Sequence, residues 1–424
     1  MLSHSVRFLP FGLLLLILTL SGCGSPDTQQ PGGNEVRTDA FTEEEAQLFA
    51  DMRETGILFW TPEMQLLGYR NPGIINPIRE LDASAEPFPL PDAEEKIEEV
   101  LYLFNNGVRD LDYYMEEMNA AGVLVIKDGE IVLEEYRYGN EPHTPWISFS
   151  VTKSVLSMMF GLAIEDGYIS SVDDLVVEYL PELEGTAYDE VTIRHMLWMS
   201  SGVSWNEDYA DPDSDVSGMQ YMRTERDLID YVSELGRVAE PGTRFNYNTA
   251  ETNLAGSVLK AATGMYLTEY ANERIWQAFG MEHDASWNLM GENDIEHGGC
   301  CINASLRDYG RIGMMALNNG VNAQGEALFP GDWMEQSLQP APSFEGYGYF
   351  WWLHGDGRYS GSGIFGQHLH INPDENLIIA MHGKWEQATG SELSAHRRAF
   401  IEGLTDAARN LSGSTCCSEQ AAAE

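Results

Sequence analysis

The sequence is poor in basic side chains. It has 24 lysines and arginines against 67 aspartates and glutamates in 424 residues, which gives a formal net charge of −43. A surface of this sign repels phosphate backbones, so the composition argues against nucleic acid as a partner. The acidic excess indicates high solubility, and a docking face for a cationic partner is the alternative. Hydrophobic residues still make up 43% of the chain, which is enough for a folded core.

Only the first twenty residues carry a long apolar run, and that run is short for a membrane span. Residues 8–20, FLPFGLLLLILTL, follow an arginine, as in a secretory signal peptide. The run ends in LSGC, which resembles a bacterial lipobox. We therefore expect a signal peptide at 1–22, lipid attachment at Cys23 and a flexible tether at 23–40, with an uncleaved anchor as the alternative. By the same resemblance, the Gly-Ser after the cysteine implies an outer membrane anchor facing the periplasm.

Cysteine is scarce, with five in the whole chain. Apart from the N-terminal one, they form two adjacent pairs, Cys300-Cys301 and Cys416-Cys417. Because export implies an oxidising compartment, we expect two disulfides that join the C-terminal tail to the body, in a pairing that the sequence does not fix. A four-cysteine zinc site is the less favoured alternative, since zinc ligands are usually two to four residues apart.

The order of strand and helix patterns indicates the fold class. Residues 121–139 have two β-branched runs around a Lys-Asp-Gly turn, which predicts a hairpin. Helical patterns dominate the middle of the chain, and YGYFWWLH, RYSGSGIFGQHLHINP and NLIIAMHG predict three strands near its end. We expect an α+β fold with an antiparallel sheet flanked by helices. The expected parts are a mixed, partly helical extension at 41–110, one large domain at 111–410 and a tail at 411–424.

Lysine is also rare, and two of the five lysines complete a Ser-x-x-Lys: Ser150–Lys153 and Ser257–Lys260. A serine in the first turn of a helix keeps a free N–H for an oxyanion, and the helix dipole favours negative charge there. Ser150 fits this position because Pro145 and the β-rich WISF precede it and an apolar helix follows. Lys153 would lie one turn on, where burial lowers its pKa so that it can act as a base. Ser257 lies inside a predicted helix, so it is interpreted as a packing residue with Lys260 reaching outward.

Three longer segments extend this pattern. In order they are SFSVTKSVLSMMFGLAIEDGYISSVDDLVVEYLPEL, VTIRHMLWMSSGV and PGTRFNYNTAETNLAG. Together they resemble the serine hydrolases of the class C β-lactamase type, a family that includes penicillin-binding D,D-peptidases, certain esterases and the nylon-oligomer (6-aminohexanoate-dimer) hydrolases. The resemblance covers residues 120–400 and implies a serine β-lactamase or penicillin-binding-protein-like fold with a largely helical second lobe. It also implies that Ser150 is the nucleophile and Lys153 its base, without metal or cofactor.

Two further family elements match, each with a departure. Tyr247-Asn248-Thr249 resembles the family Tyr-x-Asn, which implies that Tyr247 relays a proton to the leaving group, while Thr249 offers a hydroxyl in place of an amide. A glycine-serine-glycine at 361–363 matches the family Lys-Thr-Gly, with Gly363 against the substrate and Ile364 supplying the second oxyanion N–H after Ser150. Position 361 lacks the family's cation for a substrate carboxylate, which argues against an efficient β-lactamase and for an esterase or amidase.

A loop and a histidine pair complete the candidates. SWNEDYADPDSDV at 204–216 resembles the loop of nylon-oligomer hydrolases in which a tyrosine, here Tyr209, closes over the bound amide; a solvated acidic loop is the alternative. Its acidic side chains would suit a substrate with a free amine; they are Glu207, Asp208, Asp211 and Asp213. HLH at 368–370 places two histidines on one strand face, but no third ligand with suitable spacing follows, so no metal site is expected.

The expected function is that of a lipid-anchored periplasmic serine hydrolase acting on a small ester or amide, with no nucleic-acid partner and an oligomeric state that the sequence leaves open. The rival enzymes are a true β-lactamase or a D,D-peptidase. A non-catalytic scaffold lipoprotein is the rival outside enzymes. A Ser-His-Asp hydrolase is disfavoured because the chain has no Gly-x-Ser-x-Gly elbow.

Overall fold

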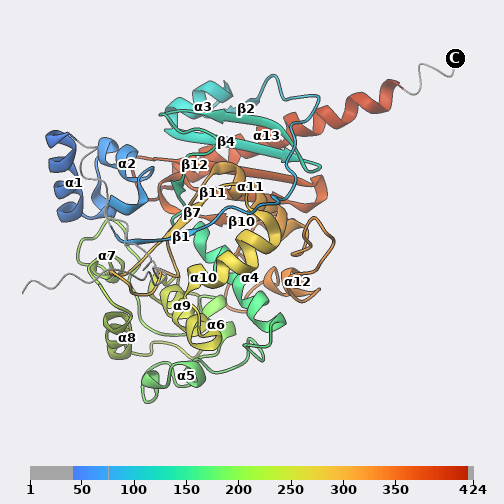
Figure 1. Cartoon of the computed structure of the whole chain (residues 1–424). Helices are drawn as coiled ribbons and strands as arrows, with labels where there is room; N and C mark the ends of the chain where they lie inside the picture. The colour runs from blue at the N-terminus through green and yellow to red at the C-terminus, as the bar shows by residue number, and fades with distance from the viewer. Residues whose placement is uncertain (1–41, 75, 419–424) are drawn as a thin grey trace, which may run out of the picture. The chain divides into compact units, whose positions relative to one another are not determined.

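The computed structural model describes residues 42–74 and 76–418 (Figure 1). The predicted signal peptide, the Cys23 lipidation site and the tether lie outside the described residues. Within this part of the chain, no helix combines the length and the apolar character that crossing a membrane requires.

A six-stranded antiparallel sheet forms the centre of the fold, in the order β5-β4-β12-β11-β10-β9. Its strands are β4 (Ala120–Lys127), β5 (Glu130–Tyr136), β9 (Trp352–Leu353), β10 (Tyr359–Ser362), β11 (His368–Asn372) and β12 (Leu377–Gly383). The predicted β4–β5 hairpin is confirmed, with Asp128 and Gly129 at positive φ in the turn. The prediction of one strand in RYSGSGIFGQHLHINP is wrong. This segment holds both β10 and β11, because Phe365 adopts a left-handed φ of 57° and turns the chain between them.

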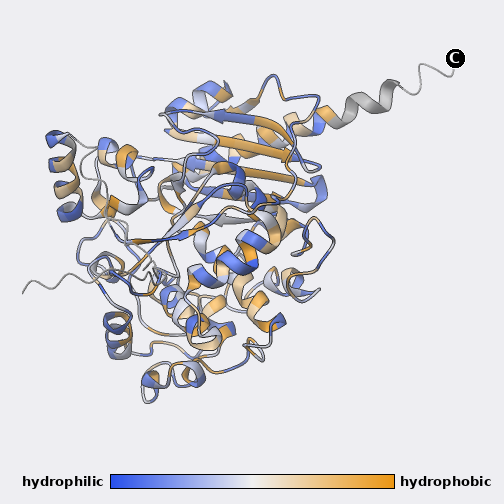
Figure 2. Ribbon diagram, in the orientation of Figure 1, coloured by the Kyte–Doolittle hydropathy of each residue, from blue (hydrophilic) through white to orange (hydrophobic). Residues whose placement is uncertain are grey.

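The alternation of side chains along β4 assigns each face of the sheet to a layer of helices. Leu124 and Ile126 pack on the side of α4 (Val151–Glu165) and α11 (Leu306–Leu317), whereas Val123 and Val125 pack on the side of α3 (Leu111–Glu117) and α13 (Ser391–Ser418). Hydrophobic residues accordingly run along these strands (Figure 2). The expected α+β fold is confirmed.

A second, four-stranded sheet leads the chain into the helical lobe. Its order is β1-β7-β8-β6, with β1 (Ile78–Leu81), β7 (Ala285–Asn288), β8 (Ile302–Ala304) and β6 (Trp146–Ile147). Strand β6 runs directly into α4, whose residues from Val151 to Ala163 are all buried. Helix α4 packs against α9 (Thr249–Thr263) in this lobe. The other helices of the lobe are α5 (Val176–Tyr179), α6 (Ile193–Leu197), α7 (Asp215–Met219), α8 (Glu225–Glu234), α10 (Leu267–Ala271) and α12 (Trp333–Ser337).

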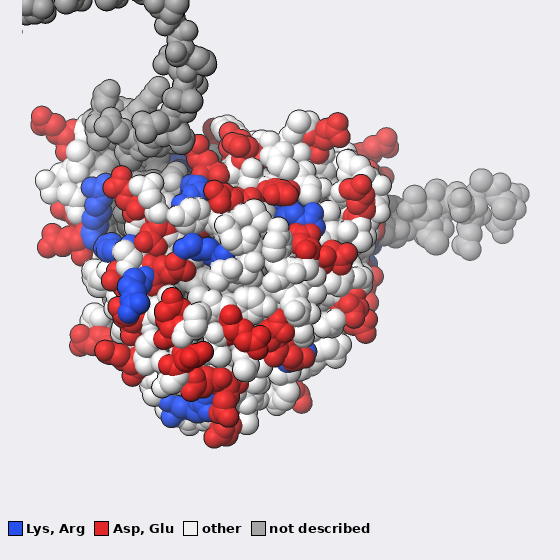
Figure 3. Space-filling view, turned by 60° about the horizontal axis from the view of Figure 1, so that its bottom comes forward, with Lys and Arg blue, Asp and Glu red and all other residues white. Residues whose placement is uncertain are grey.

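The segment before β4 contributes elements to both parts of the fold. Helices α1 (Glu43–Thr55) and α2 (Pro62–Gly68) pack into a cluster that includes Phe149 and Phe365. Strands β2 (Leu101–Phe104) and β3 (Gly107–Asp110) form a hairpin against α13. Acidic side chains are spread over the face shown in Figure 3, as the net charge predicts.

Candidate active site

Ser150 lies at the junction of β6 and α4. It is the N-cap residue of α4, and Phe149 before it has a left-handed φ of 44°. Phe149 is held in this sparsely populated conformation by the rings of Tyr69 and Phe365, at centroid distances of 5.3 and 5.5 Å. Across residues 42–418 apart from 75, no acceptor takes the N–H of Ser150. The serine therefore presents both its hydroxyl and an unused donor at the start of a buried helix.

Lys153 lies one helical turn beyond Ser150, as the spacing predicts. Its Nζ donates to Ser150 Oγ at 3.0 Å and to the carbonyl oxygen of Gly299 at 2.8 Å. The side chain is 1% exposed. Burial lowers the pKa of Lys153 to about 8, and the nearby carboxylate of Glu207 partly opposes this change. A substantial fraction of the amine is therefore neutral near pH 8 and able to accept a proton.

Tyr247 comes from the segment that leads into α9. Its ring lies 5.2 Å from Lys153 Nζ, and an interaction of its hydroxyl with Ser150 opposes part of the effect of burial on its pKa. Burial raises the pKa of Tyr247 well above its ordinary value, so the phenol keeps its proton at neutral pH. Asn248 fixes this segment to the helix, because its Oδ1 accepts the backbone N–H of Glu251 at 3.1 Å. Ser150 and Lys153 at the start of α4 thus lie together with Tyr247, which comes just before α9.

The end of β10 approaches the two residues that precede Ser150. A Cβ at Gly363 would lie 2.5 Å from Ser148 O and 3.0 Å from Phe149 Cβ, so only glycine permits this close approach. Ile364 follows in a 3₁₀ turn, and among the described residues its N–H has no acceptor. A Cβ at Gly361 would come within 2.9 Å of Ser154 Oγ. A lysine at position 361 would therefore require the buried Ser154 side chain on α4 to shift.

Thr249 and Tyr209 meet at a residue that the sequence did not single out for this role. The carboxylate of Glu207 accepts a hydrogen bond from Tyr209 OH at 2.6 Å and from the Thr249 N–H at 3.0 Å. It also accepts from Thr249 Oγ1 and Trp205 Nε1. Because both oxygens are occupied by protein donors, Glu207 is not available to hold a substrate amine in this arrangement.

Gly299 is a second residue that the sequence interpretation missed. Its backbone lies against the lysine, since a Cβ there would be 3.2 Å from Lys153 Nζ. Asn253 Oδ1 holds the loop by accepting the Gly299 N–H at 2.9 Å. Asn253 follows Thr249 by one helical turn, so the i, i+4 spacing on α9 could have drawn attention to it.

The cysteines next to this loop differ from expectation. Cys300 and Cys301 are bonded to each other, so the prediction that this pair joins the C-terminal tail is wrong. Adjacent cysteines satisfy each other locally and leave no sulfur for a distant partner. Cys416 and Cys417 lie on α13, but their side chains are outside the described residues.

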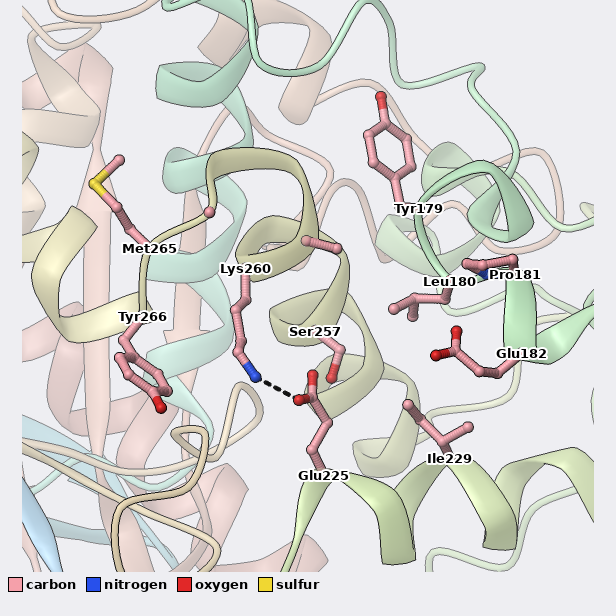
Figure 4. Close-up of a pocket in the computed structure, with 12 residues that line it drawn as sticks. Tyr179, Leu180, Pro181, Glu182, Glu225, Ile229, Ser257, Lys260, Met265 and Tyr266 are labelled. Atoms are coloured by element: carbon pink, nitrogen blue, oxygen red, sulfur yellow. Dashed lines mark hydrogen bonds and ion pairs between the residues drawn. The ribbon is translucent and has the colours of Figure 1, made fainter.

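The second Ser-x-x-Lys pair has a different environment (Figure 4). Ser257 is fully buried in the interior of α9, and Lys260 turns away to form an ion pair with Glu225 on α8. The two residues line a pocket of about 490 Å³ whose walls do not include Ser150 or Lys153. Ser257 and Lys260 therefore lack the helix-start donor and the buried, unpaired amine that the first pair has.

A serine, a histidine and an aspartate also meet elsewhere in the fold. Ser305 Oγ lies 2.8 Å from Asp308 Oδ2 and 3.2 Å from His283 Nδ1. Ser305 is buried and accepts the Asp308 N–H as the N-cap of α11, so this cluster caps a helix. His368 and His370 stack 6.2 Å apart on β11, as the strand period predicts. Within the described chain, no three histidine, cysteine or acidic side chains are grouped as metal ligands would be.

Comparisons with known proteins point to one family. A model of the Beta-lactamase family matches residues 109–402. The 6-aminohexanoate-dimer hydrolase of Paenarthrobacter ureafaciens is 29% identical over 300 residues, which cover 65% of this chain and 75% of that protein. A solved structure from Bacillus anthracis, provisionally assigned as a 6-aminohexanoate-dimer hydrolase, aligns with a TM-score of 0.73 at 22% identity, covering 83% of this chain and 96% of that one. A solved structure from Bacteroides dorei, provisionally assigned as a β-lactamase, aligns with a TM-score of 0.55 at 19% identity. The alignment covers 69% of this chain and 97% of that one.

Proposed function

Because the chain belongs to the beta-lactamase family of serine hydrolases, we propose that it cleaves an ester or amide bond through an acyl-enzyme on Ser150. The observation that carries this proposal is the 3.0 Å hydrogen bond between Lys153 Nζ and Ser150 Oγ. Lys153 is buried, and none of the carboxylates in the described residues forms an ion pair with it. A hydroxyl attacks a carbonyl only when a base takes its proton, and a neutral buried amine is such a base.

The proposed reaction has two halves. Lys153 takes the proton of Ser150, whose oxygen attacks the carbonyl carbon while the N–H groups of Ser150 and Ile364 stabilise the oxyanion. Tyr247 passes a proton to the departing alcohol or amine, and the bond to the leaving group breaks. Water then attacks the acyl-enzyme, and the same groups return the proton to Ser150 as the acid is released.

An esterase or amidase role is favoured over a β-lactamase or D,D-peptidase role. Without a cation at position 361, a charge-assisted contact to a substrate carboxylate is lost. The likeness to the Paenarthrobacter 6-aminohexanoate-dimer hydrolase supports amide substrates, with Tyr209, Thr249 and Gly363 as the substrate-contacting residues. A scaffold protein without turnover is disfavoured because Ser150, Lys153 and Tyr247 are all present. We also propose attachment to the outer membrane through Cys23, on the N-terminal sequence alone.

A covalent probe tests the nucleophile. The tether-truncated protein is treated with a fluorophosphonate, and intact mass is measured beside Ser150→Ala and Ser257→Ala. We expect one adduct on the wild type and on Ser257→Ala, and none on Ser150→Ala. No adduct on the wild type would favour the scaffold alternative, and an adduct lost only in Ser257→Ala would overturn the assignment of Ser150.

A further inference from the structure

Glu207 occupies an unusual position for a loop carboxylate. It lies between α6 and α7, and four donors converge on it from two separate segments. Oε1 accepts from Tyr209 OH and Thr249 Oγ1, and Oε2 accepts from the Thr249 N–H and Trp205 Nε1. Hydrogen bonds to an ionised acceptor are stronger than neutral ones, so this carboxylate joins the two segments firmly.

The segment that Glu207 holds carries the site. Thr249 is the first residue of α9 and follows Tyr247 by two positions, so fixing its N–H fixes the backbone that aims the phenol at Ser150. A carboxylate at the unpaired N–H groups of a helix start is also favourable for the helix dipole. The methyl side of Thr249 lies against Gly299, whose carbonyl holds Lys153. Glu207 therefore holds Thr249, which carries the backbone of Tyr247 and lies against the residue that holds Lys153.

The charge of Glu207 also reaches the lysine. Among the described residues, Lys153 is faced by the Tyr247 phenol and, at longer range, by the Glu207 carboxylate. The negative charge favours the ammonium form of Lys153 and so raises its pKa against the effect of burial. It also raises the pKa of Tyr247.

We propose that Glu207 is a positioning residue of the active site, which ties the Tyr209 loop to the Tyr247–Thr249 segment and balances the charge of Lys153. This inference rests on the proposed function at Ser150. It assigns to Glu207 a structural and electrostatic part, in place of direct contact with a substrate amine.

A glutamine substitution at position 207 separates the hydrogen-bonding and electrostatic contributions of Glu207 from an effect of lost packing. In Glu207→Gln the amide oxygen can still accept from the Thr249 N–H and Trp205 Nε1, while the NH₂ group can only donate to the Tyr209 and Thr249 hydroxyls, so every hydrogen bond to an ionised acceptor is lost. The side-chain volume is almost unchanged, while the charge is lost. Glu207→Asp keeps the charge and withdraws the carboxylate by one methylene.

The test is the rate of fluorophosphonate labelling at Ser150 from pH 5 to 10, for the wild type and both variants, with thermal unfolding as a check of folding. Glu234→Gln, an exposed change of the same charge at the end of α8, is the matched control. We expect Glu207→Gln to react about 10- to 100-fold more slowly. Its rate should also reach half-maximum at a lower pH than in the wild type, because Lys153 loses its stabilising anion. Glu207→Asp should react more slowly but keep the wild-type pH midpoint, and Glu234→Gln should match the wild type in both.

The outcomes distinguish this inference from the proposed function. A wild type that is not labelled at Ser150 overturns both. If the wild type is labelled and Glu207→Gln has the same labelling rate and the same pH of half-maximal rate, only the role of Glu207 is overturned. The same holds if Glu207→Gln is labelled more slowly but its pH of half-maximal rate does not move. If Glu207→Gln does not fold, Glu207→Asp is the deciding variant. Labelling of Glu207→Asp at the same rate as the wild type would contradict the positioning role.

Discussion

At the scale of single residues, burial decides what Lys153 can do. An ammonium removed from water loses solvation, and its pKa falls to about 8. Below that pH the amine is protonated and cannot accept the Ser150 proton, so the rate of acylation should rise with pH and level off above about 8.

An arginine in place of Lys153 gives a second prediction. Arginine keeps its charge at any accessible pH, so Lys153→Arg should slow labelling by about 1,000-fold. Labelling rates across pH check both expectations, and Lys260→Arg is the control. A wild-type rate that falls as pH rises from 6 to 8 would contradict the assignment of the base.

A third residue-scale prediction concerns Glu251, a buried carboxylic acid on α9. Burial raises its pKa from 4.5 to about 8, although the Ser201 hydroxyl donates to it. Between these values the folded protein keeps a proton that the unfolded chain has released, so the free energy of unfolding decreases as pH rises through this window. Glu251→Gln stays neutral throughout.

Relative to the wild type, Glu251→Gln should therefore be more stable at pH 8 than at pH 5. The gain is at most about 1.4 kcal/mol for each pH unit crossed. Urea unfolding at the two pH values measures it, with Glu234→Gln as the exposed control. An equal difference from the wild type at both pH values would show that Glu251 titrates normally.

At the scale of secondary-structure elements, the proposed oxyanion donors, the N–H groups of Ser150 and Ile364, depend on the close approach of the end of β10 to the start of α4. Gly363→Ala would place a methyl group 2.5 Å from Ser148 O and push these elements apart. We expect labelling to slow by about 10- to 100-fold, since small misplacements of reacting groups are costly. Gly218→Ala, where a Cβ meets nothing within 4 Å, should leave the rate unchanged. Equal rates for Gly363→Ala and the wild type would exclude β10 from the site.

The same element shows where sequence patterns succeed and fail. The β4–β5 hairpin and α4 follow from local signals, namely a turn dipeptide and an apolar helix closed by Asp166 and Gly167. The division between β10 and β11 does not, because it depends on Phe365 at a positive φ. That conformation is supported from far along the chain, where Ala388 and Trp385 bond the Phe365 backbone.

At the scale of the whole molecule, the net charge of −43 predicts that folding works against self-repulsion. Raising the ionic strength from about 0.01 to 0.15 M shortens the Debye length from about 30 to 8 Å, which should raise the unfolding temperature. Each kcal/mol of relieved repulsion corresponds to about 1 °C for a chain of this size, because the entropy of unfolding grows with the number of residues. Calorimetry in sodium chloride and in potassium chloride measures the effect. Equal increases indicate screening, and a decrease in both salts would contradict it.

The sequence predicts the parts of the candidate site whose residues lie close together in the chain. Ser150 and Lys153 are three residues apart, so helix geometry joins them, and the resemblance adds Tyr247. Gly299 contacts Lys153, and Glu207 contacts Thr249, two residues after Tyr247. Both contacts come from distant segments, and no short pattern in the sequence marks them. The adjacent Cys300–Cys301 pair was likewise misjudged, because spacing alone does not tell a local bond from a long-range one.

The pairing of β12 with β4 has a consequence for how the protein is made. The paired residues Lys127 and Leu377 are 250 positions apart in the sequence. Strand β4 therefore cannot pair with β12 until nearly the whole chain has been synthesised. Contacts this distant in sequence form late, since the intervening loop must first be closed. Ser150 and the residues of α4 are synthesised long before Ile364, the proposed second oxyanion donor. With Ser150 as the proposed nucleophile, we therefore expect a ribosome-bound chain to stay unreactive until the last strands have emerged.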